Sequence, residues 1–272
     1  MKRKIIIAMS LIVLGFISIQ AQSNGGDYVP KAGGIALGAS INVEDVFYKT
    51  SVGDKVPALC AKYYLSDNTA IRATFRINST NNTNKYYVQD DAAFLVDPLS
   101  KKELVDLQNS ISSGYYSSLA VQQFLGGTRL RGFIGIQALY GNSNSKTINT
   151  YTNTMNALNP TPTSSTLYTG TAFNERVLEV KNENGYNIGA GIIAGFEYYV
   201  IPHLSIGGEI SLNAIYSHSG QEYTKSESVV NGEVVTVNKT VSPGGSGFEI
   251  RSLGFASNAN TDQLGFYIMV HF

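Results

Sequence analysis

Six charged residues stand out because each lies inside a segment where apolar and small or polar residues otherwise alternate. Charges in such places must be paired and hydrogen-bonded to be tolerated away from water. Two roles fit acids and bases in this arrangement: the lining of a narrow ion-conducting constriction, or a structural plug of ion pairs. The six residues are Lys62, Arg72, Arg76, Arg131, Glu197 and Glu209.

Catalytic chemistry is poorly represented in the chain. Of three histidines, only His218 is directly flanked by serines, Ser217 and Ser219. Neighbours along a strand point to opposite faces, so this spacing aims neither serine at the imidazole for acyl transfer. Asp90, Asp91 and Asp97 offer at most a weak Ca²⁺ site, and the sequence contains no HExxH motif and no Walker-type loop. We therefore expect a non-enzymatic protein with no cofactor and no metal.

Strands must position the six charges. The alternation of apolar and polar residues, together with the turn residues, predicts eight strands. An even number suits a closed antiparallel barrel. An alternative of ten strands would count both arms of a hairpin around Asn231-Gly232, but those arms carry too many charges for a membrane wall. The predicted strands are 32–41, 56–65, 69–77, 114–125, 129–141, 186–200, 204–218 and 262–272.

The two faces of these strands differ in a way that indicates lipid outside. The apolar faces of all but the first and fourth strands contain no Asp, Glu, Lys or Arg, and a charge at the bilayer midplane costs about 2 to 4 kcal/mol. The six charges fall on the other, inward phase. In an eight-stranded ring the second and third strands face the sixth and seventh, so Glu197 and Glu209 can pair with Lys62 and Arg72. Side chains fill an interior of this size, so we favour the plug and keep a narrow porin-like channel as the alternative.

Connections alternate between short and long. Three links of three residues separate strands, at 66–68, 126–128 and 201–203, whereas the stretches 42–55, 78–113, 142–185 and 219–261 are long and polar. Outer-membrane barrels have short periplasmic turns and long extracellular loops. Aromatic residues near strand ends predict two interfacial girdles: Tyr63, Phe124, Tyr198 and Phe272 at the short-turn rim, and Tyr140, Tyr186 and Tyr216 at the other.

The two ends of the chain point to export and membrane assembly. Lys2, Arg3 and Lys4 precede an apolar run, which predicts a cleaved signal peptide over residues 1–21, a short segment over 22–31 and a barrel over 32–272. The last strand turns Phe266, Ile268, Val270 and the terminal Phe272 to one face. Lys plus Arg and Asp plus Glu number 20 each, so nothing indicates a nucleic-acid partner.

The stretches from Ala61 to Arg72 and from Gly191 to Glu209 resemble the family of small Gram-negative outer-membrane β-barrel domains, of the OmpA and OmpX type. The resemblance implies an all-β, closed antiparallel transmembrane barrel located in the outer membrane and surrounded by its lipid. It implies a structural or surface-contact role such as adhesion, with a narrow porin-like channel next and a barrel enzyme as a remote alternative. It also implies periplasmic chaperones and a barrel-assembly machinery that reads the aromatic carboxy-terminal strand. It names no extracellular partner.

Overall fold

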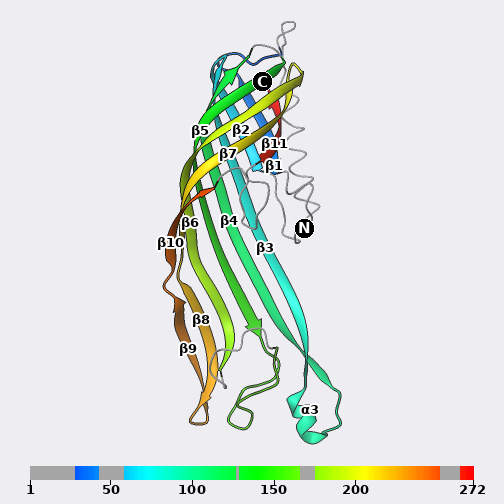
Figure 1. Ribbon diagram of the computed structural model, residues 1–272. Helices are drawn as coiled ribbons and strands as arrows, with labels where there is room; N and C mark the ends of the chain where they lie inside the picture. The colour runs from blue at the N-terminus through cyan, green and yellow to red at the C-terminus, as the bar shows by residue number, and fades with distance from the viewer. Residues whose placement is uncertain (1–27, 43–57, 127–128, 166–174, 252–263) are drawn as a thin grey trace.

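The computed structural model describes residues 28–42, 58–126, 129–165, 175–251 and 264–272. The predicted signal peptide, residues 22–27 of the next segment and nearly all of the first predicted long loop lie outside these ranges. The described chain is almost entirely antiparallel strand (Figure 1). Its elements are β1 Ile35–Asn42, β2 Ala58–Ser66, β3 Thr69–Gln89, α3 Asp91–Val96, β4 Glu103–Leu125, β5 Leu130–Thr150, β6 Glu175–Ile201, β7 Leu204–Ser219, β8 Glu222–Val230, β9 Glu233–Ser242, β10 Gly245–Arg251 and β11 Leu264–His271.

Eight of these strands close into a ring in the order β1-β2-β3-β4-β5-β6-β7-β11, and β11 returns to β1. The seam joins the two ends of the barrel: Ala36 pairs with His271, and the backbone N–H of Phe272 donates to the carbonyl of Ile35 at 2.8 Å. Closure leaves no free edge in the ring, which is the requirement for spanning lipid with strands. The predicted eight-stranded barrel is confirmed.

Short turns join the ring strands at one rim. Residues 67–68 separate β2 from β3, and residues 202–203 separate β6 from β7. The predicted hairpin is also present, outside the ring: Asn231 and Gly232 link β8 to β9 with φ values of 53° and 86°. Both values lie in the left-handed region, as a two-residue type I′ turn requires. Since β8 pairs with β6, and β9 pairs with β8, the two strands extend the wall without joining the ring.

Where the structure describes them, the stretches expected to be long loops are mostly strand, and this corrects the predicted limits. β3 and β4 continue in register from the ring as far as the pair Gln89 and Glu103, and β5 and β6 continue to the pair Ile148 and Glu179. Figure 1 shows these strands running far beyond the ring to α3 and the β8–β9 hairpin. The alternation signal fails there because both faces of this distal sheet are polar, so backbone hydrogen bonds define the strands. Among the described residues no helix is long and apolar enough to cross a membrane.

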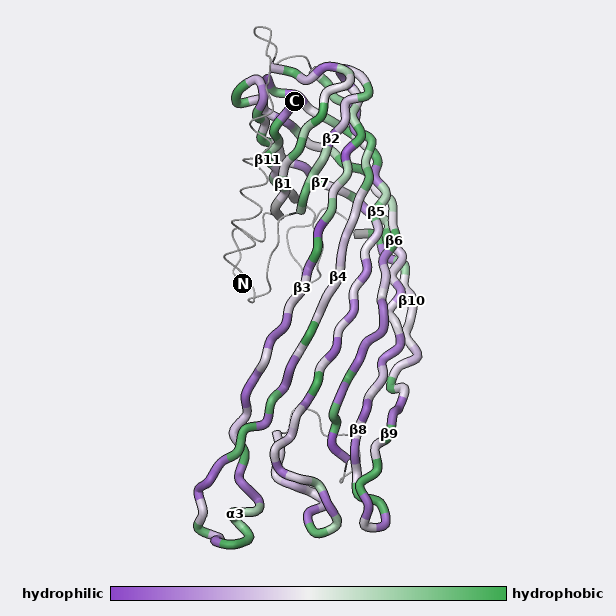
Figure 2. Tube along the Cα trace, turned by 180° about the vertical axis from the view of Figure 1, so that it is seen from behind, coloured by the Kyte–Doolittle hydropathy of each residue, from purple (hydrophilic) through white to green (hydrophobic). Residues whose placement is uncertain are grey.

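Burial in the ring is the reverse of that in a water-soluble barrel. Large aliphatic side chains point outward and are exposed, including Ile136 at 65% and Ile192 at 57%, while Lys62 and Glu197 are exposed by 1% and 0%. Figure 2 shows the change along the strands, with hydrophobic residues gathered in the ring and hydrophilic ones over most of the distal sheet. One predicted girdle residue was assigned wrongly: Phe124 is buried inside the ring, because it shares the inward phase of β4 with Ala120 and Gln122.

Candidate functional site

An ion pair between Lys62 on β2 and Glu197 on β6 occupies the inside of the ring near the short turns. Lys62 Nζ lies 2.6 Å from Glu197 Oε2, and neither side chain is accessible to solvent. Alternation brings them there, since each residue falls on the inward phase of a strand whose other phase is aliphatic. A buried pair of this kind is tolerated only when its remaining hydrogen-bonding groups are also satisfied.

The other carboxylate oxygen of Glu197 is held by two residues that sequence reasoning had not assigned to the site. Ser205 Oγ donates to Glu197 Oε1 at 2.5 Å and lies 2.7 Å from His271 Nε2. His271 Nε2 is itself 3.4 Å from Glu197 Oε1. Both residues carry the inward phase of β7 and β11, so the signal was present in the alternation. The sequence did not show the stagger between β6, β7 and β11, which brings Glu197, Ser205 and His271 to the same height in the ring.

Aromatic rings surround the ammonium group of Lys62. Its Nζ lies 4.6 Å from the ring centre of Tyr267, 5.3 Å from that of Phe124 and 5.8 Å from that of Phe133. Each contact is of the cation–π type, which is stronger where water is excluded. Tyr267 lies against the backbone of Gly207, where an added Cβ would come within 2.2 Å of the phenol ring. A glycine at this position is therefore needed for the tyrosine to reach the lysine.

The other predicted inward charges divide between the ion pairs and the turns. Arg72 on β3 binds Glu209 on β7, a second pair across the interior. Arg131 takes a different role: it donates to the carbonyls of Gly126 at 3.2 Å and Asp67 at 2.7 Å, and to Asn68 Oδ1 at 2.8 Å. It therefore fastens two short turns to each other at the rim. Arg76 lies farther along β3 and is partly exposed.

Together these contacts fill the ring close to its short-turn rim. Tyr64, Phe124, Phe133 and Met269 complete the packing and are all buried. A second polar layer lies farther from the rim, where Gln137 Nε2 donates to Asn213 Oδ1 at 2.8 Å. Aromatic rings enclose the Lys62–Glu197 pair, while Glu209 in the second pair keeps 21% of its side chain accessible.

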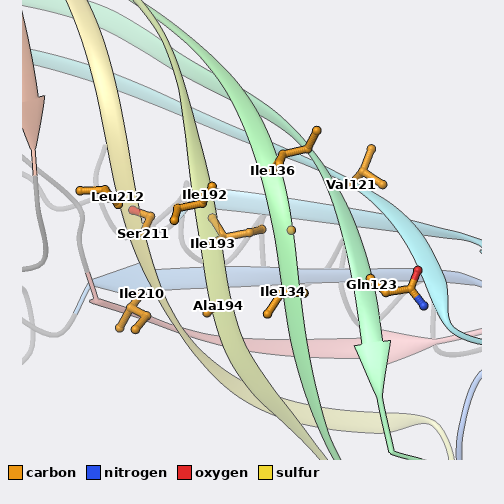
Figure 3. Close-up of a pocket in the computed structure, with 11 residues that line it drawn as sticks. Val121, Gln123, Ile134, Ile136, Ile192, Ile193, Ala194, Ile210, Ser211 and Leu212 are labelled. Atoms are coloured by element: carbon orange, nitrogen blue, oxygen red, sulfur yellow. The ribbon is translucent and has the colours of Figure 1, made fainter.

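A shallow hollow lies over β4, β5, β6 and β7 (Figure 3). Its volume is about 580 Å³, and its walls are mostly aliphatic, with Ile134, Ile136, Ile192 and Ile210 pointing outward around the small Ala194. These are the same outward side chains that form the apolar belt of the ring. The hollow is thus part of this outward apolar belt, and its lining offers little chemistry for a polar substrate.

A second polar network stabilises the distal end of the molecule. The buried carboxylate of Asp106 accepts the backbone N–H groups of Thr152 at 2.8 Å and Ser165 at 3.0 Å. Asn153 donates through Nδ2 to the carbonyls of Gln89 and Thr163, each at 2.7 Å. These bonds tie the segment 151–165 to the end of the β3–β4 hairpin, so the distal loops form a connected structure.

Arg176 connects that segment to the β8–β9 hairpin. Its Nε donates to Glu227 Oε1 at 2.5 Å, its Nη1 donates to the carbonyl of Asn153 at 2.9 Å, and its guanidinium carbon lies 4.8 Å from the ring centre of Tyr151. Burial raises the pKa of the Tyr151 hydroxyl. Next to it, Lys239 donates to both oxygens of Glu175 at 2.8 and 2.9 Å. The hydrogen bonds from Lys239, and then from Ser226, lower the pKa of the Glu175 carboxyl.

The candidates for catalysis and metal binding have other roles here. His218 Nδ1 lies 3.1 Å from the hydroxyl of Ser246 on β10, and its ring packs against Tyr186, so neither adjacent serine is its partner. Asp90 caps α3 and pairs with Lys102 at 2.9 Å; this hydrogen bond, followed by one from the N–H of Ala93, lowers the pKa of its carboxyl. Asp91 accepts a hydrogen bond from Asn159, and Asp97 accepts one from the N–H of Leu99 in its own loop. Within the described ranges no three His, Cys, Asp or Glu side chains gather to hold a metal.

No family model matches the chain, and no curated protein matches it in sequence. Solved structures do resemble it. The N-terminal β-barrel domain of Pseudomonas aeruginosa OprF is 11% identical over 89% of this chain and 100% of that one, with a TM-score of 0.35. Ail, the attachment invasion locus protein of Yersinia pestis, is 10% identical over 88% and 97%, with a TM-score of 0.33. The outer membrane protein OprG from Pseudomonas aeruginosa is 10% identical over 91% and 99%, with a TM-score of 0.35. At such scores the fold rests on the strand pairing described above.

Proposed function

We propose that this protein is an integral barrel of the Gram-negative outer membrane that serves as a non-enzymatic surface-contact component. The observation that carries the proposal is the reversed burial of the ring, with exposed isoleucines outside and a solvent-free Lys62–Glu197 pair inside. In water the outer belt would expose far more contiguous apolar surface than a soluble monomer tolerates. In a bilayer the same belt faces hydrocarbon, and the ring supplies every backbone hydrogen bond.

The distal sheet is the part that meets the environment. The short turns face the periplasm, and the extensions of β3 to β6, with β8 and β9, project outward. The ion-pair plug supports a barrel that anchors this sheet and does not conduct. A rigid platform held by Asp106, Asn153 and Arg176 presents contact residues at little entropic cost on binding, which supports a structural or adhesive role.

Biogenesis follows from the two ends of the sequence. Residues 1–21 direct export and are cleaved, periplasmic chaperones carry the unfolded chain, and the barrel-assembly machinery reads the last strand. Phe266 and Ile268 are exposed on β11, the strand that pairs with both β7 and β1. Val270 on the same strand is half-buried, and the terminal Phe272, which follows β11, is exposed. A machinery that recognises this strand would hold the chain at the seam that closes last.

Two measurements test the proposal on mature protein refolded with lipid vesicles. A folded barrel floats with the vesicles in a density gradient and migrates faster on a gel before boiling than after it. In planar bilayers the plugged ring gives no steady current. Folded, dispersed protein in buffer without lipid or detergent would contradict the membrane assignment, and steady open-channel current would replace the plug with the porin-like alternative.

A further inference from the structure

The edge of β9 is open on a sheet that is otherwise paired. β9 pairs with β8 along one side, and its other side has no partner among the described residues. The strand is ten residues long, contains no proline and is exposed over nearly its whole length. Natural proteins usually protect such an edge, because its unpaired N–H and C=O groups form a template for another strand.

The turn before β9 determines which of its backbone groups face outward. Asn231 and Gly232 make a two-residue turn, so Val230 and Glu233 form the hydrogen-bonded pair beside it. Hydrogen-bonded and non-hydrogen-bonded pairs then alternate along the hairpin. The backbone groups of Val234, Thr236 and Asn238 therefore point to the open edge. A partner strand must align its own outward groups with these three.

A second copy of β9 meets that condition in one antiparallel register with matched charges. If Thr236 lies opposite Thr236, then Val234 lies opposite Asn238, and their outward groups coincide. On one face of the sheet, Val235 then meets Val237. On the same face Glu233 meets Lys239, whose Nζ also donates to both oxygens of Glu175 in its own copy, and the two-fold axis repeats this pair. These are the only charged residues of β9, and opposite charges and β-branched pairs stabilise facing strands.

The direction of β9 determines where the second copy must be. The strand begins at the distal hairpin and runs back toward the ring (Figure 1). Two copies in one membrane would carry β9 in the same direction along the membrane normal, which antiparallel pairing forbids. We propose that β9 is a homophilic contact strand that pairs with β9 of a second copy in an opposing membrane. This inference rests on the outer-membrane assignment proposed above.

The test uses single barrels in lipid nanodiscs, which leave both membrane sides accessible. Sedimentation velocity at rising concentration should show paired discs, and negative-stain images should place the two discs at opposite ends of the particle. Glu233→Lys puts Lys opposite Lys twice and should weaken pairing by about tenfold. Lys239→Glu should weaken it similarly, and it also removes the ion pair of Lys239 with Glu175 inside each copy. Lys85→Glu, an exposed charge reversal on β3, is the matched control and should pair as the original does.

Mixing the two charge variants is the decisive step. Discs carrying Glu233→Lys should pair with discs carrying Lys239→Glu, because both facing positions again hold opposite charges, and damage to the hairpin cannot produce this recovery. Unpaired original discs, no recovery on mixing, or side-by-side discs in the same orientation would each overturn the inference. Failure to enter discs at all would instead overturn the membrane assignment, and the inference with it.

Discussion

The ring and the distal sheet are built from the same strands but face different surroundings. Within the ring, aliphatic and polar residues alternate along β3 to β6, and charged side chains of the interior are shielded from water. Beyond the ring β3 and β4 keep their register, whereas the β5–β6 pairing shifts between Ser143 and Ser145. There β3 exposes a run of Asn, Thr and Lys on both faces. The comparison shows that hydrogen-bonded strand pairing continues across the boundary, whereas the kind of side chain on the strand faces changes there.

Breaking an ion pair inside the ring should therefore lower the free energy of unfolding more than breaking an ion pair in the distal sheet. Replacing Lys62 with Ala leaves Glu197 buried without its cation, which should lower the free energy of unfolding by about 3 to 5 kcal/mol. The matched change Lys181→Ala breaks an exposed pair with Glu183, whose atoms lie 3.8 Å apart, and should cost less than about 1 kcal/mol. Urea unfolding in lipid vesicles, followed by gel migration without boiling, measures both. Equal losses would show that the interior of the ring is hydrated.

A charge placed on the outer surface tests directly whether that surface faces hydrocarbon or water. Ile136 in the belt and Val241 on β9 are exposed to a similar extent, 65% and 60%. Ile136→Arg should destabilise the barrel by about 2 to 4 kcal/mol, because the guanidinium would face hydrocarbon. Val241→Arg should change the stability by less than about 0.5 kcal/mol, since the side chain stays in water. The same unfolding assay compares the two variants. If Ile136→Arg leaves the stability unchanged, the bilayer does not contact this part of the ring.

The distal platform should open without disturbing the ring. Arg176→Ala removes the ion pair with Glu227 and the bond to Asn153, which should cost about 1 to 3 kcal/mol locally. Limited proteolysis should then cut within 151–165, while gel migration of the barrel stays unchanged. Lys146→Ala, which breaks a more exposed pair with Glu179 at 2.9 Å, is the control and should leave the segment resistant. Loss of the folded barrel in Arg176→Ala would show that the two regions fold as one unit.

Sequence reasoning succeeded where one face of a strand belongs to the outward apolar belt. The alternation in β6 and β7 predicted both strands and placed Glu197 and Glu209 inward, opposite Lys62 and Arg72 on distant segments. It failed in the distal halves of β3 to β6, because a strand with water on both faces needs no apolar phase. The contact of Ser205 with His271 was missed for a different reason. It depends on the stagger between strands around the ring, which no local pattern encodes.

Acid should loosen the distal sheet through Glu175. Because Lys239 and Ser226 lower the pKa of this carboxyl in the folded protein, its ionised form stabilises the β6–β8–β9 region above the ordinary carboxyl pKa. That contribution is lost as the pH falls through the lowered value. Hydrogen exchange of β9 amides, corrected for intrinsic rates, should therefore accelerate as the pH falls below the ordinary range of a carboxyl pKa. In Glu175→Gln this step should vanish, and Glu183→Gln, an exposed acid on β6, should retain it. If Glu175→Gln keeps the acid step, another carboxyl controls the hairpin, and the acid sensitivity of the distal sheet would not reside in the Glu175–Lys239 pair.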